Sequence, residues 1–524
     1  MSKNRPLAIS ALVASAVAAG AVAAAPAMAA ETGASTGTTT TTNANTTDAP
    51  TKLDRIGGDT RYETAINASQ AAFPTAGSAK GVVIARGDVY VDALAGTPLA
   101  AKSGSALLLT DSKTLTAGVA DEIKRLLGTG EAAKKKTITI LGGEVAVTPA
   151  VEKQLKALGY TVDRVGGFDR YATALGIAGS LHAKNAIVAT GMNFADALAA
   201  GPLAAAAPDS AIVLSNGGVV TDAATAAFVK SAGTVTSVGV PAVNAVNKLG
   251  VKDTELSGAD RYATAAEVAT KSILKDSKSA VVANGLNFAD PLVGGVYAAT
   301  NHGALLLTDP QNLSASTAVG LVGFSTSLQD VKIFGGLSAV SAKVETQIKA
   351  VLAVGYEGYI QQLKADVAKA QTAVDAAQKA YDAAVAVPGA AEVAFDSAAQ
   401  KSSDKAVADA ETALFDAAKV STDTKVQAAY AAYAKAVDAN ARSTARWNLG
   451  VAIDGSTDKA LGTAAAALDA AVQATKDAAV TTADAAVTKA VQDSAASVKS
   501  TGDKLTAAQA ALAAAQKALA DAQK

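Results

Sequence analysis

One nine-residue pattern occurs three times in this chain, and an internal repeat constrains the fold more strongly than any single motif. The pattern reads Gly-Gly-Asp-Thr-Arg-Tyr-Glu-Thr-Ala from Gly57, Gly-Gly-Phe-Asp-Arg-Tyr-Ala-Thr-Ala from Gly166 and Ser-Gly-Ala-Asp-Arg-Tyr-Ala-Thr-Ala from Ser257. Its arginines stand at positions 61, 170 and 261, so the intervals are 109 and 91 residues. Each interval is long enough for one small domain. We therefore expect three tandem modules of one fold.

Each copy of the pattern is followed by short apolar runs in a fixed order. In the first copy these runs begin at Gly81, Ala106 and Ile138, and comparable runs recur in the other two copies. The runs are apolar throughout, as is typical of strands that are buried on both faces, and the intervals between them are long enough for helices. The sequence therefore predicts an α/β module built on a parallel sheet.

An aspartate recurs at the start of one expected helix in every copy. Asp290 is followed by Pro291, a pair that suits an N-cap with proline in the first helical position. Asp92 and Asp196 occupy the corresponding positions in the other two copies. We expect all three aspartates to be helix caps.

Composition indicates an exported protein. Residues 1–30 combine Lys3 and Arg5 with an apolar stretch and a small-residue cleavage site, which predicts a signal peptide, and the Thr-rich residues 31–51 predict a flexible linker. The chain has no cysteine, which excludes disulfides, thiol catalysis and cysteine-ligated metals. A net charge of −1 argues against a basic nucleic-acid binder. No later apolar run reaches the length of a membrane span.

From about residue 355 the pattern changes to alanine-rich heptads. Apolar residues from Ile360 to Ala384, and again from Leu505 to Ala522, recur three and four positions apart, as in a coiled coil. Pro388-Gly389 and residues 450–455 are the apparent breaks, so we expect three helices over 355–387, 390–448 and 457–524. The short breaks favour an antiparallel hairpin, although pairing between chains fits the same seam.

The repeats resemble the type 2 cell-wall-binding repeat family of Gram-positive bacteria. The resemblance rests on the repeated Arg-Tyr pattern, on Asn-Phe-Ala-Asp-Ala-Leu-Ala-Ala, on Leu-Leu-Leu-Thr-Asp and on Ile-x-Gly-Gly, and it covers about Lys52 to Val354. It implies three Rossmann-like α/β modules around a pseudo-threefold axis, over 52–162, 163–255 and 256–354, followed by a long Ala-rich helical coiled-coil rod over 355–524. It also implies noncovalent binding to an anionic cell-wall polysaccharide or teichoic-acid-like polymer, and we expect no cofactor.

Arginine is scarce before the helical region, and five of its seven positions after the predicted signal peptide belong to the glycine-turn motif. A guanidinium pairs bidentately with phosphate or carboxylate, and backbone amides at a helix start favour the same anions. The candidate polymer contacts are Arg55, Arg61, Arg164, Arg170 and Arg261. The alternative is that these arginines tie to Asp92, Asp196 or Asp290 and hold a turn onto the end of a strand.

The same region offers further candidates for polymer contacts. They are Asp92, Asp196, Asp290, Asn193 and Asn287. For the asparagines and for the tyrosines of the repeated pattern, capping and core packing are the alternative roles. The copies also differ: the third has Glu255 and Ser257 where the others have arginine and glycine, and the second has Gly239-Val240 where the others have Gly-Gly. If binding needs the full motif, the first two modules carry most of it. If binding lies at the interfaces between modules, these differences matter less.

Catalysis is not expected. The aspartates recur in every copy, whereas a catalytic site is normally built once, and the two histidines, His182 and His302, have no second ligand near them in the sequence. We therefore expect neither a catalytic residue nor a metal site. The favoured function is a surface protein whose helical rod has a structural or surface-layer role. A coiled-coil recruiter or regulator of a cell-wall hydrolase, and a hydrolase with an unrecognised site, are the alternatives.

The helical region is expected to self-associate or to bind a protein partner. Trp447, the sole tryptophan, lies with Arg442 and Arg446 beside the expected break at 450–455. This tip is the candidate partner contact, and a core position within a helical hairpin is the alternative for Trp447.

Overall fold

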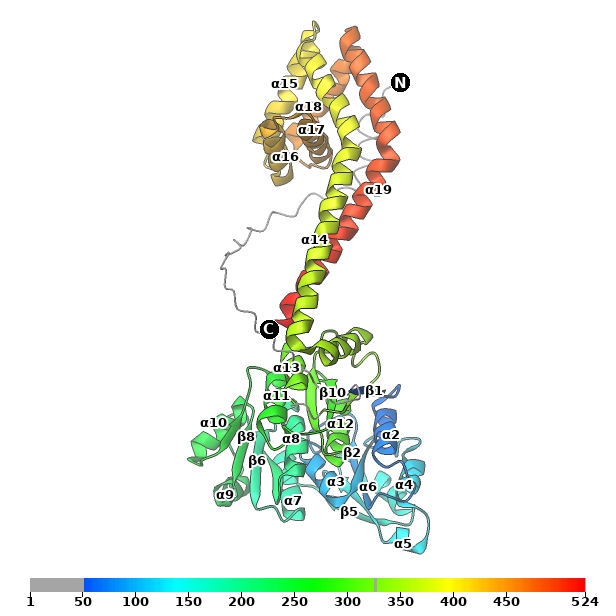
Figure 1. Ribbon diagram of the computed structural model, residues 1–524, viewed down its shortest axis with the longest axis vertical. Helices are drawn as coiled ribbons and strands as arrows, with labels where there is room; N and C mark the ends of the chain where they lie inside the picture. Colours follow the sequence, from blue (N-terminus) through cyan, green and yellow to red (C-terminus); the bar gives the residue numbers. More distant parts are fainter. Residues whose placement is uncertain (1–50, 325–327, 524) are drawn as a thin grey trace. The chain divides into compact units, whose positions relative to one another are not determined.

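The computed structural model describes residues 51–324 and 328–523 (Figure 1). The predicted signal peptide, and the predicted linker up to residue 50, lie outside the described residues. Contacts divide the described chain into two units. Residues 51–362 together with 518–523 form the α/β unit, and residues 363–517 form the helical unit.

The α/β unit contains three parallel four-stranded sheets. The first sheet has the order β3 (Ser105–Thr110), β2 (Gly81–Arg86), β4 (Thr137–Leu141), β5 (Thr161–Val165). The second has the order β7 (Ser210–Ser215), β6 (Asn185–Thr190), β8 (Val235–Val238), β9 (Thr254–Leu256). The third has the order β11 (Ala304–Thr308), β10 (Ser279–Asn284), β12 (Asp330–Phe334), β1 (Lys52–Ile56). The predicted α/β fold is confirmed, and β2, β6 and β10 are almost wholly buried because helices cover both faces.

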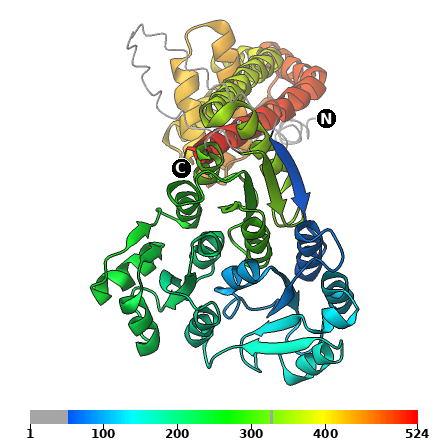
Figure 2. The same ribbon diagram turned by 60° about the horizontal axis from the view of Figure 1, so that its bottom comes forward.

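The strand before each nine-residue pattern completes the sheet of the preceding copy. Arg164 on β5 lies opposite Ile140 of β4, and Arg55 on β1 lies opposite Ile333 of β12. The first strand therefore belongs to the last sheet, where the Lys332 ammonium donates to the Asp54 carboxylate at 2.7 Å. Figure 2 shows β1 in blue beside the green strands of this sheet. This exchange connects the first and third repeats without a covalent link.

Three equivalent helices begin at the arginines of the repeated pattern. They are α2 (Arg61–Ala72), α7 (Arg170–Ser180) and α11 (Arg261–Lys271). Thr60, Asp169 and Asp260 are their N-caps, and each side chain accepts a backbone N–H from the first turn. The residue before the arginine therefore starts the helix in every copy.

Three further helices, rich in alanine and glycine, pack against one another in the middle of the α/β unit. They are α3 (Gly96–Ser103), α8 (Ala195–Ala206) and α12 (Ala289–Thr300). Small residues allow this close approach: a Cβ at Gly201 of α8 would lie 2.8 Å from the Cβ of Thr97 on α3. The remaining helices of this unit lie on the outside of the sheets: α4 (Val119–Leu127), α5 (Glu131–Lys134), α6 (Pro149–Lys156), α9 (Ala223–Ser231), α10 (Val240–Leu249) and α13 (Ala315–Gly323).

The prediction that the recurring aspartates cap helices is wrong. Asp196 and Asp290 are the second residues of α8 and α12, whose N-caps are Phe194 and Phe288, and Asp92 precedes the start of α3. Two of the helices begin one residue before their aspartate and the third begins after it, so none of the three aspartates is at the N-cap position.

The helical unit contains two long helices and four short ones. They are α14 (Ala342–Gln400), α15 (Lys405–Val420), α16 (Thr424–Lys435), α17 (Ala439–Asp454), α18 (Lys459–Ala474) and α19 (Ala478–Ala522). α14 begins in the α/β unit and bends at Gly355, whose φ is 74°. Tyr381 and Val385 of α14 share one buried cluster with Val480, Val487 and Val491 of α19. Of the predicted seam residues, Tyr381 and Leu505 are buried in this cluster, and Val374, Ala377 and Ala384 pack against it.

The predicted break at Pro388-Gly389 is wrong, because α14 continues through both residues. At this point the backbone of α14 packs tightly on α17, where a Cβ at Gly389 would lie 2.0 Å from the carbonyl oxygen of Ser443. The helices end instead at turns of the type Ser/Thr-x-Asp, whose aspartates, such as Asp404 and Asp458, cap the following helix. The predicted helix over 390–448 is accordingly divided among α14, α15, α16 and α17.

The short turns of the helical unit also lie beside one another in pairs. The Ser402 hydroxyl donates to the Asp477 carboxylate at 2.7 Å, and the Ser421 hydroxyl donates to Asp458 at 2.8 Å. α15 and α18, which lie between these two pairs, have the same length of 16 residues and pack along each other. The sequence therefore repeats a capped helix within the helical unit.

Candidate functional site at the repeat junctions

The repeated arginines hold the start of each motif helix onto the end of the central strand. The Arg61 guanidinium donates to the carbonyl oxygen of Gly87 at 2.5 Å, and that of Arg261 donates to Gly285 at 2.7 Å. Arg170 makes the equivalent bond to Gly191. Among the described residues none of these three arginines forms an ion pair with a carboxylate. One edge of each guanidinium is thus engaged by the backbone, and its other N–H groups have no hydrogen-bond partner within the described chain.

The neighbouring tyrosine of each pattern packs on the same glycine. A Cβ at Gly87 would lie 2.5 Å from the Tyr62 ring, and a Cβ at Gly285 would lie 2.5 Å from the Tyr262 ring. Burial raises the pKa of both tyrosine hydroxyls. These contacts correspond to packing, the alternative role for the tyrosines. A glycine follows each central strand because a larger residue would collide with the tyrosine ring.

Aromatic side chains from all three repeats meet beside two of these arginines. Tyr90 lies 5.6 Å from Phe194 and 5.7 Å from Phe288 between ring centroids, and the two phenylalanines lie 6.5 Å apart. The Arg61 guanidinium lies over the Phe288 ring at 5.6 Å, and that of Arg261 lies over Phe194 at 5.7 Å. We call Tyr90, Phe194 and Phe288 the aromatic triad.

Sequence reasoning missed the aromatic triad. Each of its members stands two residues before the recurring aspartate, at Asp92, Asp196 and Asp290. That constant spacing was the available signal, but the first copy has Tyr90 within a different local sequence, which conceals the equivalence.

The recurring aspartates lie at the junctions between repeats. Asp92 accepts a hydrogen bond from the Thr173 hydroxyl at 2.9 Å. Burial raises the pKa of Asp290, and a hydrogen bond from Thr64 and the charge of Arg61 oppose this shift. Each of these bonds connects one repeat to another, because the threonine belongs to the nine-residue pattern of a different copy. We call these the Asp92 junction and the Asp290 junction.

The third junction contains Asp196. Burial raises the pKa of its carboxyl to about 6, and the nearby Arg261 guanidinium only partly offsets that shift. Asp196, Arg261 and Thr264 line a cavity of about 170 Å³. We call this the Asp196 junction.

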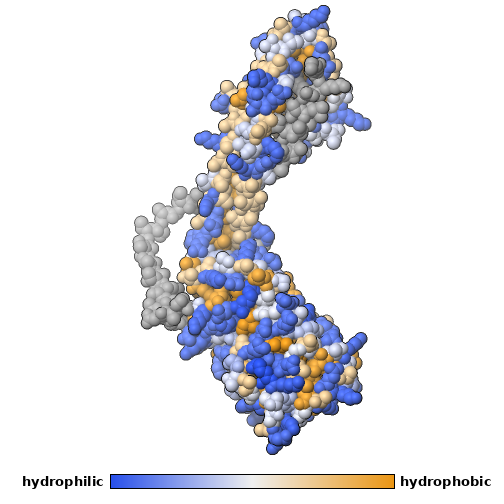
Figure 3. Space-filling model, turned by 90° about the vertical axis from the view of Figure 1, so that its right-hand side faces the viewer, coloured by the Kyte–Doolittle hydropathy of each residue, from blue (hydrophilic) through white to orange (hydrophobic). Residues whose placement is uncertain are grey.

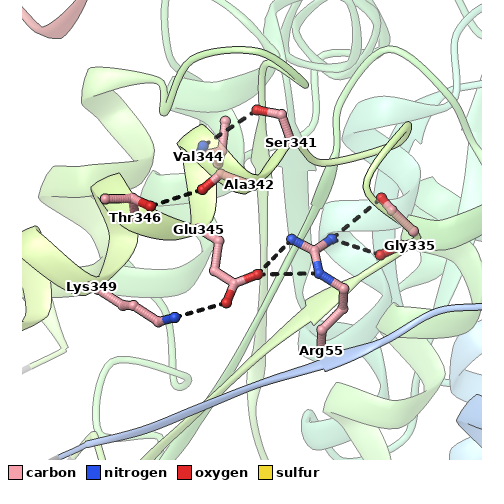
Figure 4. Close-up of polar contacts among 9 residues, drawn as sticks. Arg55, Gly335, Ser341, Ala342, Val344, Glu345, Thr346 and Lys349 are labelled. Carbon is pink, nitrogen blue, oxygen red and sulfur yellow. Dashed lines mark hydrogen bonds and ion pairs between the residues drawn. The ribbon is translucent and has the colours of Figure 1, made fainter.

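Arg55 and Arg164 form structural ties at two of the three sheets. The Arg55 guanidinium donates to Glu345 at 2.9 Å and to the carbonyl of Gly335 at 2.8 Å, and Figure 4 shows it between these partners. Arg164 repeats the arrangement with Glu152 at 2.6 Å and Gly142 at 2.9 Å. These contacts match the alternative of a tie at the strand end, but the partners are glutamates and carbonyls rather than the recurring aspartates.

The two candidate asparagines are exposed and make local bonds. Asn193 accepts the backbone N–H of Phe194 at 2.7 Å, and Asn287 accepts that of Ala289 at 3.2 Å. Both therefore stabilise the entry into a central helix, and their amide N–H groups have no partner in the described residues. Asn193 also lines the cavity of the Asp196 junction.

Trp447 is only 2% exposed. It therefore occupies a core position, which was the alternative prediction, and not an exposed tip that could contact a partner. Beside it, Arg446 is paired with Glu392 at 2.8 Å and with Asp396 at 2.6 Å. Burial opposes the charge of Arg446, but the surrounding carboxylates raise the pKa of its guanidinium far above the usual range. The neighbouring Arg442 is exposed, with its guanidinium 5.4 Å from the Tyr433 ring centroid.

In residues 51–324 and 328–523, no group of three or more His, Cys, Asp or Glu side chains could hold a metal ion. No helix in this part of the chain is long and apolar enough to cross a membrane. On the face shown in Figure 3, hydrophilic and hydrophobic residues are mixed over the α/β unit.

Comparisons with known proteins place the repeats in a family. Residues 55–152, 164–246 and 255–345 each match the family described as cell wall binding domain 2. The chain is 32% identical over 310 residues to the N-acetylmuramoyl-L-alanine amidase LytC of Bacillus subtilis, and 30% identical over 304 residues to the amidase enhancer of the same organism. Each likeness covers 58% of this chain, and the matched parts are 59% and 41% of those relatives.

A solved structure of a cell-wall protein resembles the same part of this chain. The structure of Cwp8 from Clostridium difficile is 28% identical, has a TM-score of 0.50, and matches over 56% of this chain and 51% of that one. The three matched segments contain the repeated arginines, the aromatic triad and the junction aspartates described above. This chain belongs to the family of proteins that carry cell wall binding domain 2, in three tandem copies.

Proposed function

We propose that the three repeats hold this protein noncovalently on an anionic secondary polymer of the cell wall. The observation that carries the proposal is the placement of Arg61 and Arg261 over rings of the aromatic triad, together with the equivalent backbone bond that Arg170 makes in the second copy. Each guanidinium uses one N–H edge for a strand-end carbonyl and keeps other N–H groups for a ligand. An arginine fork suits phosphate or carboxylate groups, and the aromatic rings offer apolar faces to sugar rings.

Repetition of the site would raise the overall affinity for the polymer. A polymer carries many equivalent acidic groups, so once one arginine is engaged the others meet the ligand at a high effective concentration. Weak individual contacts then suffice for stable attachment. The same argument predicts that binding weakens as salt rises, because exposed ion pairs are screened.

The test is cosedimentation of the full chain with purified walls, before and after acid extraction of the secondary polymers. The informative variant replaces Arg61, Arg170 and Arg261 together by lysine, which keeps the charge and removes the planar fork. Arg125→Lys is the matched control, because Arg125 is paired with Glu122 on α4 outside the junctions. We expect binding by the wild type and the control, at least tenfold weaker binding by the triple variant, and loss of binding after extraction. Binding that survives extraction unchanged would refute the proposal.

The α/β unit is proposed to act by binding rather than by catalysis, and the helical unit to have a structural or surface-layer role outside the wall. The matched relatives include an amidase and an amidase enhancer by name, and this supports a second candidate, in which the helical unit recruits or regulates a wall hydrolase. Ordered arrays of the full chain on walls in electron microscopy would support the first role. Copurification of a single hydrolase would support the second, and release of sugars or peptides from walls by the pure protein would contradict the proposal of binding alone.

A further inference from the structure

The three repeat junctions are built from the same motifs, but the Asp196 junction differs from the other two. Its cavity of about 170 Å³ lies between the starts of α8 and α10 and the turn before α11. The side chains of Asn193, Asp196, Arg261 and Thr264 line it, with Val240 at the start of α10. By a comparable measure one water needs only about 10–15 Å³, so the cavity has room for one sugar ring rather than for isolated waters alone.

The copies also differ in sequence at this junction. At the other two sheets an arginine on the edge strand ties the glycine turn to a glutamate, as Arg164 does with Glu152. In the second sheet the corresponding residue of β9 is Glu255, which lies opposite Ser237. α10 also begins directly after Gly239, so the second glycine of the turn is replaced by Val240. The Asp196 junction therefore lacks the arginine tie that the Asp92 and Asp290 junctions have.

Of the three junction carboxylates, that of Asp196 is the one to which no described residue donates a hydrogen bond. Asp92 accepts the Thr173 hydroxyl, and Asp290 accepts that of Thr64. No described residue donates a hydrogen bond to the Asp196 side chain, although it lines the cavity and is only partly exposed. The corresponding threonine, Thr264, accepts the backbone N–H of Gly258 at 3.1 Å, as Thr64 and Thr173 do in their own copies, but it donates no hydrogen bond to Asp196. A partly buried carboxylate without donors is costly, and a ligand that donates hydroxyl groups would remove that cost.

We propose that the Asp196 junction is the specific sugar-binding site of this protein, in which Asp196 accepts hydroxyl groups of one sugar residue and Arg261 faces its acidic substituent. The assignment rests on the proposed binding of the wall polymer and adds which junction recognises an individual residue. Arg261 suits this role because its guanidinium lies over Phe194 and donates from one edge to Gly285, which leaves its other N–H groups for the ligand. The carboxylates of Asp92 and Asp290, which are already hydrogen bonded within the protein, have a structural role.

The experiment compares Asp196→Ala with Asp92→Ala in the full chain, using the polymer extracted from purified walls as the probe. Titration calorimetry measures affinity, and thermal unfolding measures stability. We expect Asp196→Ala to weaken binding about 10- to 100-fold, the change expected for one lost hydrogen bond to a charged group, with no loss of thermal stability. We expect Asp92→Ala to lower stability, because it leaves the buried Thr173 hydroxyl without its acceptor, and to change affinity less than about threefold at a temperature where it is folded.

A second variant tests the cavity without removing any polar group. Val240→Trp adds bulk at the start of α10, where Val240 is 52% exposed and borders the cavity. We expect it to weaken binding by a similar factor and to leave stability unchanged. Equal effects of Asp196→Ala and Asp92→Ala on affinity, or wild-type affinity in both Asp196→Ala and Val240→Trp, would overturn the assignment while leaving the proposed function intact. Absence of binding by the wild-type chain would instead refute the proposed function.

Discussion

Removal of the buried Arg446 charge should destabilise the helical unit more than single substitutions on the surface of that unit. The Arg446 side chain is 5% exposed, and it bonds to Glu392 at 2.8 Å and to Asp396 at 2.6 Å, whose side chains are 3% and 4% exposed. In Arg446→Met both carboxylates would stay buried without their cation. Loss of one partner of a buried ion pair costs about 3–5 kcal/mol, most of it from the charge left behind.

The assay is urea unfolding of the full chain, followed by the fluorescence of Trp447. Trp447 is the sole tryptophan and is buried in the helical core, so its signal reports this unit selectively. With a slope of about 2 kcal/mol per molar urea, the midpoint should fall by about 2 M. Far-UV circular dichroism provides an independent signal, because the substitution is adjacent to the fluorophore.

Arg442→Met is the matched control. Arg442 lies one helical turn away and is exposed, and its contact with the Tyr433 ring is worth about 0.5–1 kcal/mol. The triple variant Arg446→Met, Glu392→Gln, Asp396→Asn should regain part of the lost stability, because two of the uncompensated charges are gone. A loss below 1 kcal/mol for Arg446→Met, or equal losses for Arg446→Met and Arg442→Met, would refute this reasoning.

Three further predictions concern the α/β unit. Burial raises the pKa of Asp196 from 3.8 to about 6, so the folded state binds this proton more tightly than the unfolded state does. The contribution of Asp196 to stability is therefore lost as the pH rises from about 4 through 6. Asp196→Asn should flatten that decline in thermal unfolding curves and stabilise the protein at pH 7 by up to about 3 kcal/mol, and an unchanged pH profile would contradict this. Glu152→Gln weakens the tie to Arg164 and should cost about 1–2 kcal/mol in urea unfolding, whereas no measurable cost would show that the tie is screened by solvent. Gly142→Ala should cost about 1–3 kcal/mol, since Gly142 has a φ of 90° and its Cβ would lie 2.7 Å from the Asp92 carboxylate, and wild-type stability would refute this.

Local patterns in the sequence were enough to predict three of the four strands in each sheet of the α/β unit. The apolar runs predicted the buried parallel strands, and the triple repeat predicted the three sheets. These predictions succeed because burial on both faces of a strand and the repetition of a module are visible within a short stretch of chain. The heptad seam of α14 was predictable for the same reason.

Long-range contacts decided the rest. The pairing of β1 with β12 joins residues that are far apart in the chain, and neither strand carries a signal for the other. Pro388-Gly389 looked like a helix end, but the packing of Gly389 against the Ser443 carbonyl accompanies an unbroken α14. The local propensity of proline to end a helix is overridden here by tertiary packing.

The same division applies to the candidate site. The sequence by itself determined which residue types recur, namely the arginines, the aspartates and the glycine turns. Only the tertiary structure decided their roles: it gave Arg61 a carbonyl and an aromatic face, gave Arg164 a glutamate, and left Asp196 without a donor. The physical reason is that hydrogen bonding and desolvation depend on neighbours from other repeats, and the chain brings those neighbours together only when the three repeats pack against one another.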